Sequence, residues 1–394
     1  MCRGNTEKPK IHRKFREKFL QLSVTFYFEL LRLCQTSVDK ILTTSILDRS
    51  IKPDFTGNPG ILTFFLESRY NTHVKIHLPN SAFLGNLDAF IAGYSPEEPA
   101  KLEISSHKSW VSLHPVVLTM IGALGLTCAP DQITCEEITA RSGHYLERMG
   151  LFDLLKIKSG LRISKHDSSG RFIPLTQIRS SDELSRFITE IVPLLHLEPK
   201  NAEPIKYIIS ELVRNVLEHA LTKHGAIVST QYHKKSNMIR IGITDAGVGI
   251  RSTMAKSYGP ADDLDALKLA LTPGITGTTQ RIGGTAQNAG AGLFFIKSIA
   301  FVNRNFFLIY SGNALYKLLK RNPLARRINL HGDPGLDKHS ERNDLPYWRG
   351  TVVGVDLSLD TTSEFSSLLD LIRETYGKAV RDRKKARYKK PKFI

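Results

Sequence analysis

The fold is decided by ISELVRNVLEHA, residues 209–220. Apolar residues in and around this stretch come in pairs that repeat every four positions, which predicts one continuous buried face on a helix over residues 204–221. Three polar residues repeat every four positions as well: Glu211, Asn215 and His219. Positions four apart lie on the same side of a helix, so these side chains line one edge of the buried face, beside the core.

A β-hairpin and a glycine-containing turn follow this helix. Two β-type runs, AIVSTQYH (226–233) and MIRIGITD (238–245), are separated by the polar segment KKSN, and the isoleucines of the second run alternate as in a half-buried strand. Asp245 ends the second run. Gly247 and Gly249 come directly after it in DAGVGI, so the backbone can turn sharply there or approach a ligand closely.

The connection over residues 251–291 is long and rich in glycine, with one helical insert, ADDLDALKLAL. Connections this long inside compact domains are usually functional lids or disordered segments, and we expect a lid. It ends in NAGAGLFFIKSIA, where Gly290 and Gly292 open an apolar helix and leave free amide donors at its N-terminus, which suit a phosphate group. Two later runs, NFFLIYSG and GTVVGVDLSL, predict closing strands.

Together these segments resemble the GHKL class of ATPases, which contains DNA gyrase, the ninety-kilodalton heat-shock chaperone, sensor histidine kinases and the MutL proteins. Over residues 182–359, ISELVRNVLEHA is similar to the N box of the class, DAGVGI to its D-x-G-x-G box and GAGLFFI to its G-x-G-L box. Thr351 after Gly350 fits the place of a Thr near the adenine, and the ending N-x-x-x-H-A is most similar to the anti-sigma-factor kinase branch. The resemblance implies an α+β fold, a two-layer α/β sandwich of the GHKL (Bergerat) type with a smaller α/β domain before it.

The resemblance also implies ATP and Mg²⁺ as ligands. The residues that would bind the nucleotide are Asp245, Gly247, Gly249, Ile250, Gly290, Gly292, Leu293, Thr351 and His219. Mg²⁺ prefers oxygen ligands and retains water, so the amide oxygen of Asn215 with phosphate oxygens makes a reasonable shell. Glu211, one turn earlier, is suited to hold or deprotonate a water that attacks the γ-phosphate. Asp245 is suited to accept the exocyclic amine of adenine, while Ile250 and Leu293 clamp the base.

The sequence therefore predicts a Mg²⁺-dependent ATP-binding protein that hydrolyses ATP, or transfers its phosphoryl group, as a conformational or signalling switch. An ATPase and a Ser/Thr protein kinase of this class both fit. No phospho-accepting His in an H-E/D-x-x-x-P setting precedes these segments, which disfavours a complete sensor histidine kinase. The P-loop, the dinucleotide fingerprint and the H-R-D and D-F-G motifs of protein kinases are absent from the sequence.

Ordinary structural roles stay open for each segment. Glu211 and Asn215 would then form a solvated helix edge, Asp245 would precede a plain turn, and the glycines before the apolar helix would serve helix packing. His219 has two equal interpretations, a residue at the edge of the nucleotide site or a histidine satisfied at the helix end. The order and spacing of the segments together favour the ATP site.

Four regions are expected along the chain. They are a basic helical extension (1–55), an α/β domain with weak similarity to the STAS-like domains of anti-sigma antagonists (56–180), the ATP-binding domain (181–360) and a C-terminal helix with a basic tail (361–394). Within the second region, Thr134 and Glu137 resemble a capping box and predict a helix that stops at Gly150.

The net charge of +17 is concentrated at the two ends of the chain. Residues 1–40 hold nine Lys or Arg against four acidic residues, and residues 378–394 hold nine against one. Tyr388 and Phe393 lie among the basic residues of the tail, as in a flexible arm that binds a nucleic-acid backbone. The alternative function is therefore an ATP-gated binder of nucleic acid or of an acidic partner, although such runs are usually only solvated tails.

Cysteine spacing and hydropathy indicate the compartment. The four cysteines form no C-x-x-C pair and no Cys/His metal spacing, and the longest apolar stretch is shorter than a membrane helix requires. We expect a cytoplasmic protein with no membrane partner. A protein partner or a homodimer stays open.

Overall fold

The computed structural model describes residues 73–93, 100–159, 170–277, 279, 290–321, 329–360 and 365–387. The chain divides into two units, residues 1–64 and 65–394, and every described residue belongs to the second. The expected basic extension, the glycine-rich end of the expected lid and the last residues of the basic tail lie outside the described residues.

A seven-stranded antiparallel sheet is the centre of the second unit, in the order β11-β10-β9-β12-β8-β7-β6. Its strands are β6 (Phe172–Ile178), β7 (Ala226–His233), β8 (Met238–Asp245), β9 (Phe307–Gly312), β10 (Ala314–Leu318), β11 (His339–Arg342) and β12 (Trp348–Ser358). The expected hairpin is confirmed, with His233 opposite Met238. β6 lies before the domain boundary expected at residue 181, so the sheet takes an edge strand from the region expected to precede it.

β12 lies between β8 and β9, although it is the last strand of the chain. Its register places Thr351 opposite Asp245 and Val353 opposite Ile243. This pairing brings Gly350 and Thr351, near the start of β12, to the end of β8, where the glycine-containing turn begins.

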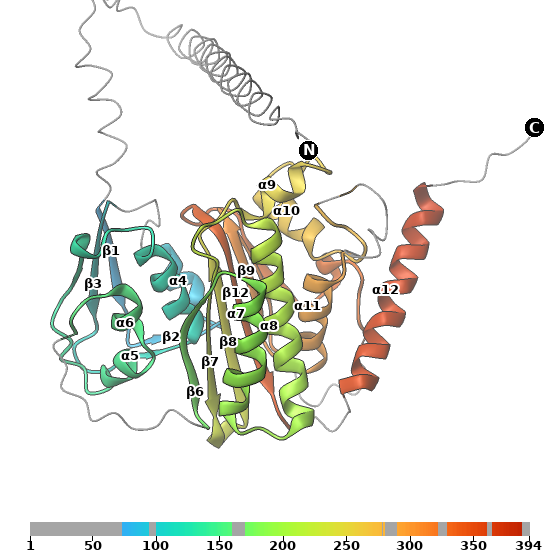
Figure 1. Cartoon of the computed structure of the whole chain (residues 1–394). Coiled ribbons are helices and arrows are strands. Elements are labelled where there is room, and N and C mark those ends of the chain that lie inside the picture. Colours follow the sequence, from blue (N-terminus) through green and yellow to red (C-terminus); the bar gives the residue numbers. More distant parts are fainter. Residues whose placement is uncertain are drawn as a thin grey trace, which may run out of the picture. The chain divides into compact units, whose positions relative to one another are not determined.

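Helices cover one face of this sheet, as Figure 1 shows. They include α7 (Ser181–Arg186), α8 (Pro199–His219), α11 (Gly292–Val302) and α12 (Phe365–Arg387). The predicted apolar face of α8 is buried, from Ile205 to Val216, and packs with α11 and the sheet in one hydrophobic cluster. Two shorter helices, α9 (Gly249–Ala255) and α10 (Asp263–Ala270), lie in the connection between β8 and α11.

A smaller α/β region covers the opposite face of the sheet, with α4 (Pro115–Gly125) against it (Figure 1). All eleven residues of α4 are buried. Gly242 of β8 permits this contact, because a Cβ there would lie 2.4 Å from the backbone nitrogen of Val116. Thr119 and Thr244 share a buried hydrogen bond of 2.8 Å between their hydroxyls. The protein is thus of mixed α and β structure, and its central sheet is covered on both faces.

The smaller region has a parallel sheet of its own, β1-β3-β5, and a two-stranded pair, β2-β4. Its elements are β1 (His73–Leu78), β2 (Ser81–Ala82), α3 (Leu87–Ala92), β3 (Lys101–Ser106), β4 (Ser112–Leu113), β5 (Ile133–Cys135), α5 (His144–Arg148) and α6 (Leu151–Leu155). The helix start expected from the capping-box pattern at Thr134 is wrong, because Thr134 pairs with Glu103 in the sheet. The expected stop at Gly150 is confirmed, because α5 ends at Arg148, just before this glycine. Among the described residues, no helix is long and apolar enough to span a bilayer.

Candidate nucleotide-binding site

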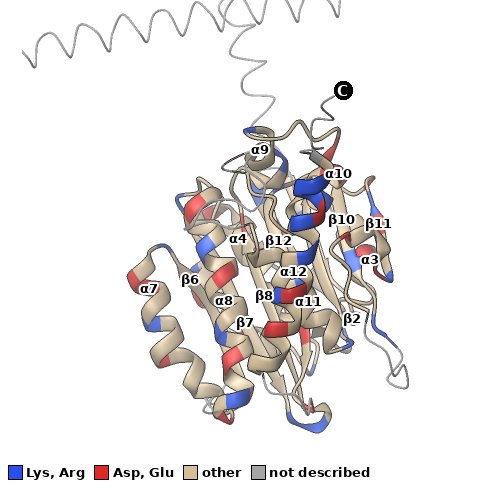
Figure 2. Ribbon diagram, turned by 90° about the vertical axis from the view of Figure 1, so that its right-hand side faces the viewer, with Lys and Arg blue, Asp and Glu red and all other residues tan. Residues whose placement is uncertain are grey.

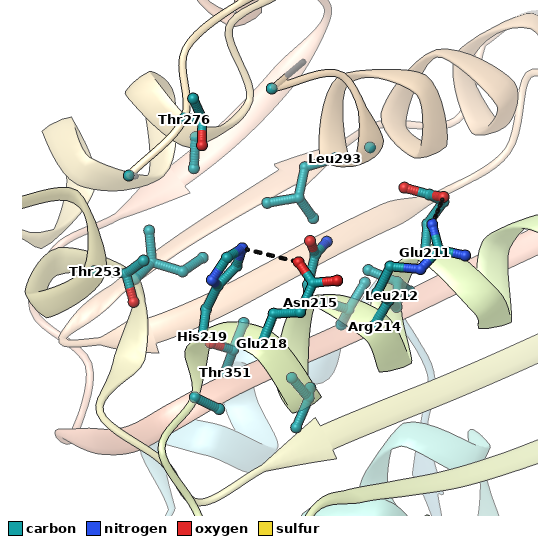
Figure 3. Close-up of a pocket in the computed structure, with 18 of the residues that line it drawn as sticks. Glu211, Leu212, Arg214, Asn215, Glu218, His219, Thr253, Thr276, Leu293 and Thr351 are labelled. Carbon is teal, nitrogen blue, oxygen red and sulfur yellow. Dashed lines mark hydrogen bonds and ion pairs between the residues drawn. The ribbon is translucent and has the colours of Figure 1, made fainter. Parts of the chain in front are cut away.

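A cavity of about 360 Å³ lies between α8, the turn after β8, α9 and the N-terminal end of α11 (Figure 3). The predicted residues that line it are Glu211, Asn215, His219, Asp245, Gly249, Ile250, Gly290, Gly292, Leu293 and Thr351. They come from α8, from the junction of β8 and α9, from the start of α11 and from β12. The structure therefore brings four separate segments of the sequence to one place.

Asp245 lies at the end of β8 with its side chain almost fully buried. Its Oδ1 accepts a hydrogen bond of 2.8 Å from the backbone N–H of Gly247. Burial raises the pKa of this carboxyl group to about 7, and hydrogen bonds from Gly247 and Thr351 oppose the rise. A buried carboxyl group held at the edge of a cavity is suited to bind an amine or amide donor of a ligand.

Gly247 is the predicted residue that does not line the cavity. It lies against the end of α8, and a Cβ there would stand 2.1 Å from the carbonyl oxygen of Ala220. Gly249 does line the cavity, with a φ of 76° that favours glycine. The turn is tied to β9, because the N–H of Ile250 donates to the hydroxyl of Ser311 at 3.0 Å.

The N-terminus of α11 forms another wall of the cavity. The helix begins at Gly292, and no side chain within the described part of the chain caps it. A Cβ at Gly292 would lie 2.8 Å from Oε2 of Glu211, so the helix start and this carboxylate are in close contact. Gly290 is required by packing as well, because a Cβ there would lie 2.3 Å from the carbonyl oxygen of Ile275.

The polar edge of α8 faces the cavity as predicted. Glu211 is half-buried and accepts a hydrogen bond of 2.9 Å from Nη1 of Arg214. Asn215 follows one turn later, and Figure 3 shows its side chain between those of Glu211 and His219. His219 forms an ion pair of 3.8 Å with Glu218 when its ring is protonated. His219 lines the cavity, as its interpretation as a residue at the edge of the site requires.

Sequence reasoning missed several lining residues, including Tyr207, Arg214, Glu218, Thr253 and Thr276. Helical spacing indicates two of them, because Arg214 and Glu218 lie three and seven positions after Glu211 and so share its side of the helix. Thr253 and Thr276 belong to α9 and to the segment before the glycine-rich end of the connection. Their place at the cavity depends on how that connection folds, which periodicity does not report.

The cavity has a size that suits a small-molecule ligand. Its volume lies within the range of about 300–1,000 Å³ common for small-molecule sites. Among the described residues, no group of three or more His, Cys, Asp or Glu is placed to hold a metal ion. Mg²⁺ bound with a nucleotide usually takes only one or two protein ligands besides phosphate and water, and the amide oxygen of Asn215 suits that mode.

Comparison with protein families and curated sequences gives no match for this chain. The contacts of the cavity are therefore the observations from which a function is argued.

Proposed function

We propose that the cavity binds Mg²⁺ and ATP, and that the antiparallel sheet with α8 and α11 is a nucleotide-binding domain of the GHKL type. One observation carries the proposal: Glu211, Asn215, Asp245, Gly292 and Thr351, which the resemblance picks out from separate segments, all line one cavity. A helix edge, a turn and a helix start that had only ordinary structural roles would have no reason to meet at a common cavity.

The two ends of the cavity would bind different parts of the nucleotide. Asp245 and Thr351 lie opposite each other on β8 and β12, where the carboxyl group would accept the exocyclic amine of adenine. Ile250 and Leu293 supply apolar contact to the base. The uncapped amides at the start of α11 would bind phosphate, because a helix N-terminus presents free N–H groups and a partial positive charge.

Glu211 would act as the general base. Its carboxylate lies against the start of α11, where the phosphates would bind. In hydrolysis, the water oxygen forms a bond to the γ-phosphorus and Glu211 takes a proton from that water. The bond from this phosphorus to the β–γ bridging oxygen breaks, and its electron pair leaves with ADP. A Ser or Thr hydroxyl in place of water would make the same site a protein kinase.

Titration calorimetry and product analysis test this function on the full chain. We expect saturable binding of ATP that requires Mg²⁺, followed by release of inorganic phosphate or transfer to a hydroxyl acceptor. Absence of ATP binding at millimolar concentration would overturn the proposal.

A second candidate is binding of nucleic acid or an acidic protein through the C-terminal basic segment. α12 continues to Arg387, so the first half of this segment is helical rather than a flexible arm. Arg381, Lys384 and Lys385 are exposed on it, and Figure 2 shows basic residues along this helix. Replacing these three by Glu should flatten the salt dependence of DNA or RNA binding. An unchanged salt dependence would exclude the segment.

A further inference from the structure

The charges around the cavity are unevenly distributed. Glu211, Glu218 and Asp245 are acidic residues of its lining. Arg214 is the single Lys or Arg among the described residues that line it. A nucleoside triphosphate carries several negative charges at its phosphate end. A mostly acidic lining repels these charges unless a positively charged group neutralises them.

Arg214 lies at that end of the cavity. Its Nη1 donates to Oε1 of Glu211 at 2.9 Å, and the other oxygen of this carboxylate lies against Gly292, the first residue of α11. The guanidinium thus contacts the carboxylate, and the carboxylate contacts the helix N-terminus. Just over half of the Arg214 side chain is exposed, so the guanidinium can be approached from the cavity mouth.

We propose that Arg214 contacts the terminal phosphate of a nucleoside triphosphate and gives the cavity its preference for ATP over ADP. This inference rests on the proposed function. A guanidinium has five N–H donors in a planar fork, which matches the oxygens of a phosphate group. In ADP the γ-phosphate is missing, so the contact is lost and Arg214 keeps its bond to Glu211.

The contact would also change the state of Glu211. In the structure, Arg214 neutralises this carboxylate and occupies Oε1. A terminal phosphate competes for the same guanidinium, so binding of the triphosphate would free an oxygen of Glu211 at the moment a water molecule has to be held. The diphosphate would leave the pair intact.

Calorimetry with Mg²⁺ and either ADP or a non-hydrolysable ATP analogue tests the inference. We expect the wild-type chain to bind the ATP analogue more tightly, and Arg214→Ala to reduce this preference by about tenfold or more, as loss of a charge-assisted hydrogen bond does. Arg214→Lys should retain part of it. Lys206→Ala is the matched control, because it removes a positive charge from α8 outside the cavity and should leave the preference unchanged.

A second background separates direct contact from simple neutralisation of Glu211. The Glu211→Gln variant lacks the repulsive carboxylate. If the guanidinium contacts the phosphate, adding Arg214→Ala to this variant should still remove the preference for the ATP analogue over ADP. An unchanged preference in that background, or in Arg214→Ala alone, would overturn the inference while ATP binding by the wild type stands. Failure of the wild type to bind either nucleotide would instead overturn the proposed function.

Discussion

The carboxylate of Glu211 lies directly against the α-carbon of Gly292, so that a Cβ at Gly292 would stand 2.8 Å from Oε2. Glu211 belongs to α8 and Gly292 begins α11, and the two helices pack on the same face of the sheet. The proposed general base and the proposed phosphate site are therefore neighbours in space, although a strand pair and the long connection separate them in sequence.

Gly292→Ala should weaken nucleotide binding with little effect on the fold. The added methyl group would press on the Glu211 carboxylate at the cavity wall, so this half-buried side chain would have to move from its place beside the phosphate end. We expect ATP affinity and turnover to fall about tenfold or more, while the melting temperature changes little. Gly259→Ala is the control, because a Cβ there has nothing within 4 Å. Equal ATP affinity in the two variants would contradict the phosphate site.

Asp245→Asn should stabilise the ligand-free protein at neutral pH. Burial raises the pKa of Asp245 from 3.8 to about 7 in the folded chain. The contribution of this group to the free energy of unfolding is therefore fully present below pH 3.8 and is lost as the pH rises to about 7. An amide does not titrate. Above pH 7 the variant should therefore be more stable by a few kcal/mol, about 4 at most.

Denaturant unfolding of both proteins between pH 4 and 8 measures this effect. The difference in free energy of unfolding should be small near pH 4 and grow toward pH 7, because every other titrating group is shared. A difference that does not change with pH would show that Asp245 is not a buried, destabilising carboxylate.

Glu211→Gln should separate turnover from binding. The amide is of similar size but accepts no proton, so phosphate release should fall by about 10²-fold or more, as for loss of a general base. ATP affinity should be unchanged or higher, because a negative charge has left the phosphate end. A turnover close to that of the wild type would assign the base to another residue.

Asn215→Ala should weaken the dependence of ATP binding on Mg²⁺. The variant removes the one amide oxygen proposed as a protein ligand of the ion, so a titration of Mg²⁺ at fixed ATP should need a higher concentration for half-saturation. ATP binding in EDTA should match that of the wild type. If the Mg²⁺ titrations of the two proteins coincide, Asn215 is not a ligand of the ion.

Asp337→Asn should destabilise the fold without acting on the cavity. Asp337 forms a fully buried ion pair with Lys297 of α11, a residue that does not line the cavity. Loss of one partner leaves an unpaired buried charge, which costs about 3–5 kcal/mol. Unfolding experiments should show this loss, and replacing both residues by apolar ones should recover most of it.

Local sequence patterns predicted individual helices and strands better than the architecture that they form. The stripe on α8 buries one face of that helix, so its periodicity alone reports it. β7 and β8 are instead buried on both faces over most of their length, so alternation does not describe them fully. The position of β12 between β8 and β9 was not predictable in this way, because strand order depends on pairing across the whole chain.

Tertiary contacts account for the differences. Thr134 and Glu137 have the pattern of a capping box, yet pairing with β3 places Thr134 in a strand. The burial of α4 against the sheet depends on Gly242, whose missing side chain admits the helix backbone. Gly247 was assigned to the ligand and serves the packing of the turn on Ala220.

Titration of the full chain with Mg²⁺ and a non-hydrolysable ATP analogue is the most direct test of the central claim. The wild type should bind one equivalent, as should Asp131→Asn, which alters an exposed aspartate outside the cavity. Asp245→Asn should lose about tenfold or more in affinity, because an amide nitrogen would face the adenine amine. No binding by the wild type, or equal affinity in Asp245→Asn, would contradict an ATP site in this cavity.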